Sequence, residues 1–478
     1  MSKTDQNVPL CIDIDGTLTY TDTLVEAYIT WLKRSPWAAI KAWLYIRDGR
    51  AQFKRAVAKH SSINVALLPY NEELITWLKE QKKQGRRLIL TTASDKLIAQ
   101  DIADHLGFID EVIGSNGVDN LSGHGKRKVL VRRFGDRGFD YAGNAPADLR
   151  VWPAARKIIV VNTGPWVRRK AEEIGHVSKQ FLRQTGRFDI KVFLHELRVH
   201  QWVKNLLIFL PLLTAHAFTD MSLLLNALFA FFAFSLTASC VYLFNDLMDL
   251  ESDREHLTKR HRPLAAGTLP IDIAVFTLLG MPALSLLIAL LLPWSFLGLL
   301  GLYVIINVAY SLLLKSIPFV DVFVLASLYV LRVFAGSAAT GIPTSIWLFI
   351  FAAFIFLSLA LVKRTSELYN LEKQGKTQAV GRGYKVQHRK LLTNVGIGSS
   401  VISLIVLGFY TTSPAVTPLY ATPLLLLLLI PIFAIWLARI WRFTLHGSMN
   451  EDPIVFAAHD TMSYATAGTA LVIIFFAI

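Results

Sequence analysis

Residues 245–267 read NDLMDLESDREHLTKRHRPLAAG, and they directly follow an apolar run long enough to cross a membrane. If this segment is helical, Asp246, Asp249 and Asp253 lie on one face of the helix, because they are three and four residues apart. Carboxylates on one face repel each other unless they share a cation. Hard oxygen ligands suit Mg²⁺ bound to a diphosphate, whereas a plain solvated loop explains the spacing poorly, because acidic groups at a membrane entrance are costly. We therefore expect a magnesium site here, in the segment that begins with Asn245.

The apolar content of the chain indicates an integral membrane protein. Hydrophobic residues make up 53% of the 478 residues and charged residues only 18%, and the apolar excess lies almost entirely after residue 205. In hydrocarbon such runs satisfy their backbone groups by forming helices. We expect an all-α domain of nine transmembrane helices, near residues 206–219, 222–244, 271–292, 295–313, 318–340, 344–362, 394–412, 421–440 and 462–478.

Lys and Arg gather at one side of this helical domain. If the N-terminus is cytosolic, the loops FTDMS, PWS, GIPTS and TTSPAVTPLYATP face outward and hold no Lys or Arg, whereas the opposite loops are basic. The net charge of +14 therefore indicates orientation rather than nucleic-acid binding, because the basic residues lie at the ends of apolar runs. The N-terminus has no apolar segment of signal-peptide length. We expect a multi-pass protein of the cell (inner) membrane whose catalytic side is cytoplasmic.

Residues 1–167 have a different pattern, in which short strand-like runs such as LCIDID, RRLILTT and KIIVVN alternate with helix-like segments. This alternation predicts an α/β domain around a parallel sheet. The basic residues 168–200 have helical periodicity and predict an amphipathic linker, and the membrane domain then covers residues 201–478. Because Cys11 and Cys240 are the only cysteines of the sequence, neither a disulfide framework nor a Cys-x-x-Cys metal site is expected.

The run CIDIDGTLT places Asp13 and Asp15 at the carboxyl end of a predicted strand. Carboxylates two residues apart on a strand point the same way, so they can share a divalent cation while one of them attacks phosphorus. Three later segments, LILTTAS, GHGKRK and YAGNAPAD, contain further polar side chains. Taken in order, the four segments resemble the signature of the HAD superfamily of phosphatases.

The resemblance implies roles for the side chains of these segments. Asp13 would be the nucleophile and Asp15 the general acid/base. Thr92 and Lys126 would hold the phosphoryl group, although Lys128 is near enough in the sequence to be the lysine in question.

The same resemblance implies a Mg²⁺ site that Asn144 and Asp148 complete together with the two aspartates of the first segment. Asn144 stands where many members of the superfamily have Asp, which removes one charge. The family inserts a helical cap after the first motif, and we expect Trp31, Trp37 and Trp43 to lie in the core of that cap.

The membrane half lacks a second cluster of carboxylates. The stretch YSLLLKSIPFVDVFVLASLYVLRVFAG, residues 310–336, contains only Asp321, together with Tyr310, Lys315 and Arg332. A buried Arg in lipid needs an anionic partner, so Arg332 pairs either with a carboxylate or with a substrate phosphate. The remaining candidates for holding phosphate groups are Lys204, Asn205, Lys259, Arg262, Lys363 and Arg364.

Several motifs of the membrane half resemble the decaprenyl-phosphate phosphoribosyltransferase branch of the UbiA superfamily. They are RxxQWVKN, NDxxDxxxD leading into TKRxRPLAAG, YSxxLK, LRVFAG and KRxxEL, and the resemblance covers residues 196–478. It implies transfer of 5-phosphoribose from phosphoribosyl diphosphate to a polyprenyl (decaprenyl) phosphate. Mg²⁺ held by Asp246, Asp249 and Asp253 would neutralise the leaving diphosphate, while Asn245 would position either the ligand set or the sugar.

The fusion of the two halves predicts consecutive reactions. Phosphoribosyl transfer leaves a phosphate monoester on the lipid-linked ribose, and a HAD domain can remove such a group. Two alternatives stay open at this point: a UbiA-type aromatic prenyltransferase with an accessory phosphatase, and a non-enzymatic lipid-phosphate binder or transporter with a sensory HAD domain. The expected partners are the two phosphorylated substrates and the bilayer, with no nucleic acid, and a homo-oligomer is compatible with the sequence.

Overall fold

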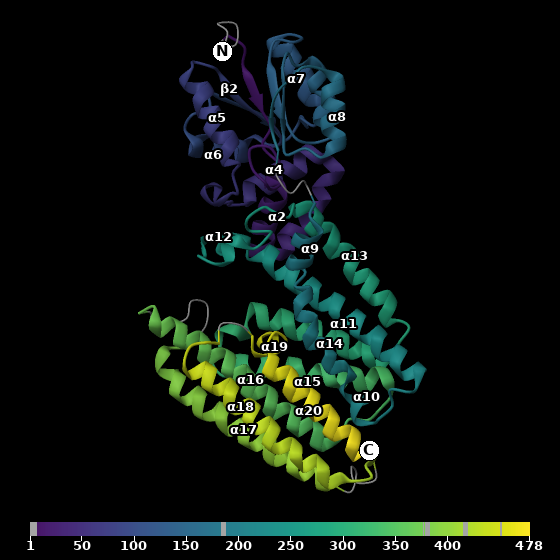
Figure 1. Ribbon diagram of the computed structural model, residues 1–478. Helices are drawn as coiled ribbons and strands as arrows, with labels where there is room; N and C mark the ends of the chain where they lie inside the picture. Colours follow the sequence, from purple (N-terminus) through teal and green to yellow (C-terminus); the bar gives the residue numbers. More distant parts are fainter. Residues whose placement is uncertain (1–6, 183–187, 376, 378–382, 414–418, 450–451) are drawn as a thin grey trace. The chain divides into compact units, whose positions relative to one another are not determined.

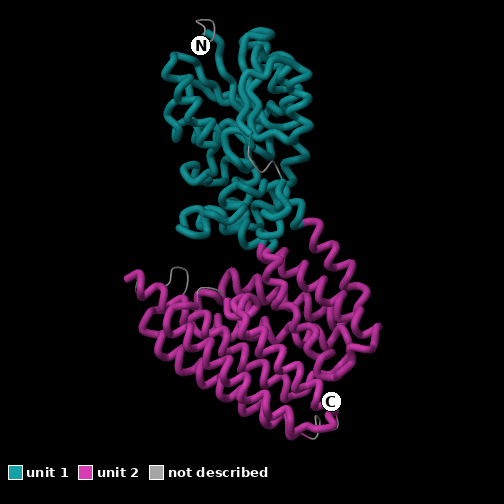
Figure 2. Tube along the Cα trace, in the orientation of Figure 1, with its two compact units in different colours: residues 1–197, 243–278 teal, residues 198–242, 279–478 magenta. Residues whose placement is uncertain are grey.

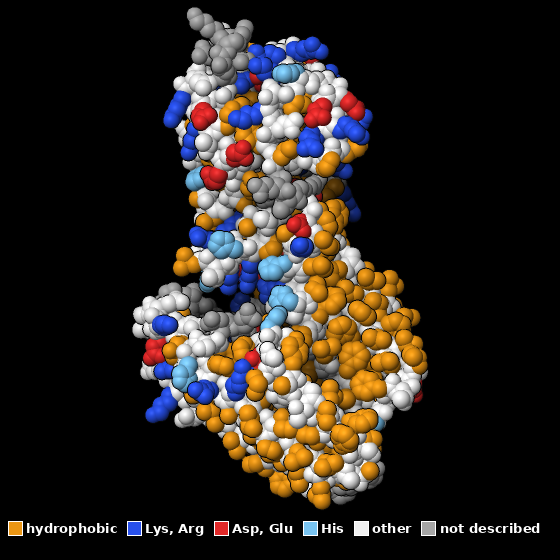
Figure 3. Space-filling model, viewed as in Figure 1, with side chains coloured by type: hydrophobic (Ala, Val, Ile, Leu, Met, Phe, Trp, Pro, Cys, Tyr) orange, Lys and Arg blue, Asp and Glu red, His pale blue; other side chains and the backbone are white. Residues whose placement is uncertain are grey.

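The computed structural model describes residues 7–182, 188–375, 377, 383–413, 419–449 and 452–478. Parts of the predicted linker (183–187) and of two predicted loops (376, 378–382 and 414–418) lie outside the described residues. The chain divides into two compact units: residues 1–197 with 243–278 form unit 1, and residues 198–242 with 279–478 form unit 2 (Figure 2). In Figure 3, hydrophobic side chains gather over the helices of unit 2, whereas charged side chains are scattered over the sheet of unit 1.

Unit 1 contains a six-stranded sheet with the strand order β3-β2-β1-β4-β5-β6, and every neighbouring pair is parallel. This confirms the α/β prediction. The strand order reverses between β1 and β4, and open α/β sheets bind ligands outside the carboxyl ends of the strands at such a reversal. The strands are β1 (Leu10–Ile12), β2 (Leu88–Asp95), β3 (Glu111–Ser115), β4 (Asp140–Gly143), β5 (Ile158–Val161) and β6 (Val177–Phe181).

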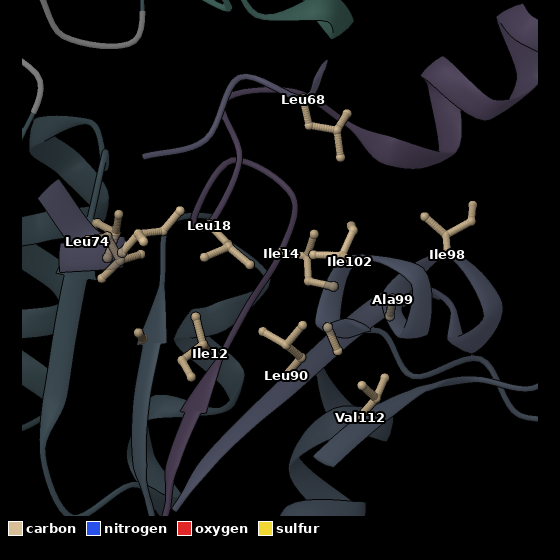
Figure 4. Packing of buried hydrophobic residues seen from close by; sticks show 14 of the residues in the cluster. Ile12, Ile14, Leu18, Leu68, Leu74, Leu90, Ile98, Ala99, Ile102 and Val112 are labelled. Carbon is tan, nitrogen blue, oxygen red and sulfur yellow. The ribbon is translucent and has the colours of Figure 1, made fainter. Parts of the chain in front are cut away.

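Helices cover both faces of this sheet (Figure 1). Ile12 and Leu90 face the layer formed by α5 (Glu72–Lys83) and α6 (Lys96–Leu106), where Figure 4 shows them among the side chains of both helices. Their strand neighbours Cys11 and Ile89 point the other way, into the core that includes α7 (His124–Phe134) and α8 (Pro165–Ile174). Because both faces are buried, the strands are apolar throughout rather than alternating.

A helical insertion separates β1 from β2, as predicted for a cap. It comprises α2 (Thr23–Arg34), α3 (Pro36–Lys41), η1 (Ala42–Asp48) and α4 (Arg50–His60). Trp31 is buried and stacks on His60 at a ring distance of 4.7 Å. The prediction is wrong for Trp37 and Trp43, which are largely exposed, because the small Ala39 and Ala42 form the inner side of the α3–η1 segment.

The acidic motif of unit 1, which consists of Asp246, Asp249 and Asp253, lies at a break between two helices. α11 (Met221–Met248) ends just before Asp249, whose backbone leaves the helical region (φ −102°, ψ 11°), and α12 (Leu250–Glu255) begins just after it. The prediction of one continuous helix face with three aspartates is therefore wrong. The chain then continues through η6 (Lys259–His261) to α13 (Ile271–Ala289).

Within the described residues, seven helical segments are long and apolar enough to cross a membrane, so the predicted count of nine is not confirmed. The first predicted stretch, residues 206–219, forms the end of η5 (Val199–Phe209) and the short α10 (Leu210–Thr214), and the last forms α20 (Thr461–Ala477), 17 residues long. The seven are α11, α13, α14 (Trp294–Leu312), α15 (Val320–Thr340), α16 (Ile346–Lys373), η8 with α17 (Val386–Thr412) and η10 with α18 (Pro423–Leu445).

A glycine brings two elements of unit 2 into close contact. The α-carbon of Gly336 in α15 faces the backbone of Ile208 in η5, and a β-carbon at this position would overlap the Ile208 carbonyl group. Glycine is therefore required for this approach. The contact holds the polar residues of η5 beside those of α15.

Candidate functional site

Unit 1 has a cleft where the strand order of the sheet reverses. Asp13 follows β1 and Asn144 follows β4, so both lie at the carboxyl edge of the sheet. The cleft has a volume of about 310 Å³, at the lower end of the range for small-molecule sites. Its polar lining includes Asp13, Asp15, Lys126, Asn144, Asp148 and Asp272.

Lys126 lies at the centre of the polar network in this cleft. Its Nζ donates to Asp13 Oδ1 at 2.7 Å and to the Tyr141 hydroxyl at 2.8 Å, and it lies 3.9 Å from Asp148 Oδ1. Burial lowers the pKa of Lys126, but the Asp13 and Asp148 carboxylates outweigh this effect and raise the pKa above its ordinary value. Lys128 is exposed. The geometry therefore favours Lys126 over Lys128 as the lysine of the cleft.

Asp15 is held in place by three hydrogen bonds from the start of the cap and the end of β2. The Thr23 backbone N–H and hydroxyl donate to Oδ1 at 2.8 and 2.7 Å, and the Ser94 hydroxyl donates to Oδ2 at 2.7 Å. Thr92 is fully buried and its hydroxyl accepts from the Ser94 N–H at 2.9 Å. The hydroxyl group that donates to Asp15 is therefore that of Ser94 rather than that of Thr92.

The charges that line the cleft favour the binding of a cation. Burial raises the pKa of the Asp13 carboxyl group to about 7, against the opposing charge of Lys126, and the carboxylates of Asp148 and Asp15 add to the rise. The buried Oδ1 atom of Asn144 has no hydrogen-bond partner, and a carboxamide oxygen is a ligand for hard cations. Excess carboxylate beside an unpartnered oxygen fits a divalent cation.

One wall of the cleft comes from residues far along the chain. Pro270, Ile271 and Asp272, at the start of α13, line it together with the residues of the sheet edge. Within the same unit, Arg254 of α12 makes a bidentate ion pair with Glu26 of α2, with N–O distances of 2.8 and 2.6 Å, and both side chains are buried. Residues 243–278 are thus attached to the cap by a desolvated ion pair.

In the acidic motif an arginine lies where a shared cation was predicted. Arg262 Nη1 donates to Asp246 Oδ1 at 2.8 Å and to Asp253 Oδ2 at 2.7 Å. Asp249 is separate from them and its Oδ1 lies 3.9 Å from Lys33 Nζ. Lys259 Nζ lies 3.7 Å from Asp253, and Asn245 lies half-buried near the end of α11. The three carboxylates do not converge on one point, and the magnesium site stays a prediction.

Unit 2 contains a second polar cluster, built around Asp452. Lys204 of η5 donates to Asp452 Oδ2 at 2.8 Å, Lys363 of α16 donates to it at 3.2 Å, and the Tyr329 hydroxyl of α15 donates to Oδ1 at 3.1 Å. Burial alone would raise the pKa of Asp452, but the Lys363 and Lys204 ammonium groups hold it well below its usual range. The Asp452 carboxylate thus forms ion pairs with both the buried Lys204 and the half-buried Lys363.

Arg332 is a buried cation next to this cluster, with 4% of its surface exposed. Its Nε donates to Asn205 Oδ1 at 2.8 Å, and its guanidinium group lies between 5.2 and 5.5 Å from the ring centres of Phe234, Tyr303 and Tyr329. In the part of the chain that the structure describes, no carboxylate lies within ion-pair distance of this group. The predicted pairing with a carboxylate is therefore not found here.

Arg364 belongs to a separate network. It pairs with Asp321, donates to the Tyr310 hydroxyl at 2.8 Å and pairs with Glu367 at 2.6 Å. Asp321 also accepts from the Tyr384 hydroxyl. These groups satisfy one another, which indicates a structural role, while Lys315 lies half-buried in η7 (Leu314–Ser316).

Sequence reasoning missed several of these residues. Asp452 stands in the run EDP, where an aspartate before a proline predicts a helix start, and it does cap α19 (Pro453–Ala457). Nothing in that pattern points to two lysines more than 80 residues away. Tyr141 was hidden in an apolar strand, and the Glu26–Arg254 pair joins positions 228 residues apart.

Comparisons with known proteins distinguish two regions of the chain, and the second includes residues 243–278 of unit 1. The model of the UbiA prenyltransferase family matches residues 206–466, and that of haloacid dehalogenase-like hydrolases matches residues 10–157. Uncharacterized protein y4nM of Sinorhizobium fredii is 37% identical over 96% of this chain and 89% of its own length. The decaprenyl-phosphate phosphoribosyltransferase of Corynebacterium glutamicum is 34% identical over 45% of this chain and 66% of its own length. A UbiA homolog from Archaeoglobus fulgidus, solved bound to GPP and Mg²⁺, is 19% identical with a TM-score of 0.45 and covers 59% of this chain and 99% of that chain.

Proposed function

The chain belongs to the UbiA prenyltransferase family and has an N-terminal HAD domain, and on this premise we propose that it carries out two consecutive reactions on a membrane lipid. The first transfers the 5-phosphoribosyl group of phosphoribosyl diphosphate to a polyprenyl phosphate. The second removes the 5-phosphate from the lipid-linked product. The similarity to a decaprenyl-phosphate phosphoribosyltransferase over 45% of the chain supports the first reaction.

The observation that carries the proposal is the excess of positive charge in unit 2. Lys204 and Lys363 share one carboxylate, Asp452. Among the described residues, the buried Arg332 beside them has no carboxylate within ion-pair distance and donates to Asn205. A buried arginine in a membrane protein is costly unless an anion reaches it. Substrate phosphates supply such anions. Phosphoribosyl transfer brings two phosphorylated substrates to the site, whereas an aromatic prenyltransferase brings only its prenyl diphosphate.

The transfer does not require a strong general base. The lipid phosphate is ionised at neutral pH, so its oxygen attacks the anomeric carbon directly while the bond from that carbon to the diphosphate breaks. Mg²⁺ bound at the acidic motif would supply charge neutralisation for the departing diphosphate. Lys204 and Lys363 would hold phosphate oxygens, and Arg332 would complete the charge balance.

The second reaction would use the cleft of unit 1. Asp13 attacks phosphorus, and the ribosyl oxygen leaves with a proton from Asp15. Water then hydrolyses the resulting acyl phosphate and releases inorganic phosphate. Lys126 neutralises the phosphoryl oxygens, and Mg²⁺ held by Asp13, Asn144 and neighbouring oxygens would add charge stabilisation.

The wall of the cleft favours a lipid-linked monoester as the phosphatase substrate. Ile271 both lines the cleft and begins α13, a helix long and apolar enough to cross a membrane. An alcohol held against this wall therefore lies next to the start of a membrane-crossing helix. This location suits a sugar carried by a membrane lipid, on the cytoplasmic side that the basic loops indicate.

The test combines both reactions in one assay. The purified protein in detergent is incubated with polyprenyl phosphate, phosphoribosyl diphosphate and Mg²⁺, and the lipid products are identified by mass spectrometry. We expect ribosyl lipid from the native protein, phosphoribosyl lipid from Asp13→Asn, and neither from Asp246→Asn. No ribose on the lipid under any condition would overturn the proposal, and consumption of an aromatic acceptor with a prenyl diphosphate would favour an aromatic prenyltransferase. Substrate binding without turnover would favour a lipid-phosphate binder or transporter.

The role of the positive cluster has its own test. Arg332→Gln removes a buried charge without a large change in volume, and we expect it to lower the transfer rate by about 10²-fold or more. Arg439→Gln is the matched control, because Arg439 already pairs with Asp460 in the same unit. Equal rates for the two variants would contradict a role for Arg332 in substrate binding.

A further inference from the structure

The cap of unit 1 exposes a group of large apolar side chains. In the α3–η1 segment, Trp37 is 79% exposed, and Ile40, Trp43, Leu44, Tyr45 and Ile46 are also exposed. We call these six residues the apolar patch. They belong to one continuous helical stretch of 13 residues, Pro36–Lys41 followed by Ala42–Asp48.

The packing of this stretch explains why its large residues face outward. Its buried positions are Ala39 and Ala42, which fit close to the rest of the cap, with the Tyr28 hydroxyl donating to the Ala39 carbonyl group at 3.3 Å. Trp43 keeps a polar contact at its edge, because its Nε1 donates to the Tyr28 hydroxyl at 2.8 Å. The Trp43 ring also packs on the rings of Tyr28 and Phe53, with ring centres 6.0 and 5.4 Å apart. The other five residues of the patch do not belong to the buried core of the cap, so folding of the cap does not account for their hydrophobicity.

Basic residues surround the apolar patch. Arg34, Lys41, Arg47 and Arg50 are all exposed, and Asp48 is the only acidic residue between positions 34 and 50. Exposed Trp and Tyr beside Lys and Arg are the composition of segments that lie in a membrane interface. Each basic residue near an anionic lipid surface adds to the attraction.

We propose that the apolar patch inserts into the headgroup region of an anionic lipid bilayer and holds the HAD domain against the membrane surface. The charge of the surrounding residues selects the lipid surface over an apolar face of another protein, because four cations beside such a face would be left without partners. The inference is independent of the reaction that the cleft catalyses. It gives the cap a second function as a membrane anchor.

The test measures lipid contact at single labelled positions in the full-length chain. Cys11 and Cys240 are buried, so a fluorescent thiol label can be directed to a cysteine placed by Trp37→Cys or Leu44→Cys. Val118→Cys is the matched control, since Val118 is 83% exposed on the same unit and lies outside the apolar patch. The proteins are reconstituted into vesicles of phosphatidylcholine alone or with about a third phosphatidylglycerol. Quenching by lipids that carry a nitroxide near the headgroup reports contact.

We expect the label at positions 37 and 44 to be quenched at least about threefold more strongly than the label at 118, with the larger effect in anionic vesicles. Adding Lys41→Glu with Arg47→Glu should reduce this quenching in anionic vesicles to the level seen in neutral ones. Equal quenching at positions 37, 44 and 118 would overturn the proposal. If the label at position 37 is shielded from solvent equally in detergent and in lipid, and the lipid nitroxides do not quench it, then protein covers the patch. That result would also overturn the proposal.

Discussion

Lys126 shows what a single residue contributes to the cleft. Its ammonium group contacts Asp13 and Tyr141 and is almost fully buried, while Lys128, two residues later, is exposed. On a helix, positions i and i+2 point in different directions, so only one of these lysines can face Asp13.

We predict that Lys126→Met abolishes the phosphatase reaction and that Lys128→Met leaves it unchanged. Losing a preorganised charge at a phosphoryl group costs about 10²–10³ in rate. The measurement is phosphate release from phosphoribosyl lipid by the two variants, with transfer activity as the reference. A normal rate for Lys126→Met would show that Lys126 does not contact the phosphoryl group.

Gly16 is a second residue on which the cleft depends. Its φ of 75° is in the left-handed region, and a β-carbon here would overlap the Asn144 amide nitrogen. Gly85 has a similar φ of 83° but nothing within 4 Å of its β-carbon position.

We expect Gly85→Ala to cost only the backbone strain of about 1 kcal/mol. Gly16→Ala should show the same strain and also displace Asn144, so that phosphatase activity is lost. Thermal unfolding and phosphate release from both variants separate the two effects. Comparable activity in both would mean that the position of Asn144 does not matter for catalysis.

At the scale of elements, the ion pair between α2 and α12 joins the cap to the segment that forms a cleft wall. Both side chains are buried, so removing one leaves a charge without a partner. Such a loss costs about 3–5 kcal/mol, against about 0–1 for an exposed pair.

Reversing each charge singly, in Glu26→Arg or Arg254→Glu, should therefore lower the melting temperature and the phosphatase rate, and the double reversal should restore much of both. The exposed pair Lys170–Glu173 is the control, and its reversal should have little effect. If the single reversals at Glu26 and Arg254 are as mild as those at the control pair, the ion pair does not hold the wall in place.

For the whole molecule, the lipid product connects the two proposed reactions. Phosphoribosyl lipid is soluble in the bilayer, so it can diffuse from one molecule to another. We predict that Asp13→Asn and Asp246→Asn proteins in the same vesicles together produce ribosyl lipid, although neither does so alone. Phosphoribosyl lipid that accumulates in the mixture would instead mean that the product passes only within one chain.

Local sequence patterns predicted much of this architecture. Apolar runs predicted the parallel strands and most of the membrane-crossing helices, because burial in a sheet or in lipid requires hydrophobic residues at every position. Asp13, Asp15 and Asn144 could be assigned to one sheet edge because strand ends meet there. The two shortest predicted spans, at residues 206–219 and 462–478, are not among the seven long apolar helices of the described residues, and each is shorter than a bilayer requires.

Tertiary structure alone decided which distant side chains became partners. Sequence pattern favoured Lys126 without excluding Lys128, put three aspartates on one helix, and offered no partner for Glu26 or Asp452. Packing resolved each case: a break at Asp249 separates the carboxylates, Arg262 joins two of them, and two lysines converge on Asp452. Periodicity is a property of neighbouring residues, whereas the pairing of charges across tens or hundreds of residues is fixed only when the folded chain removes them from water.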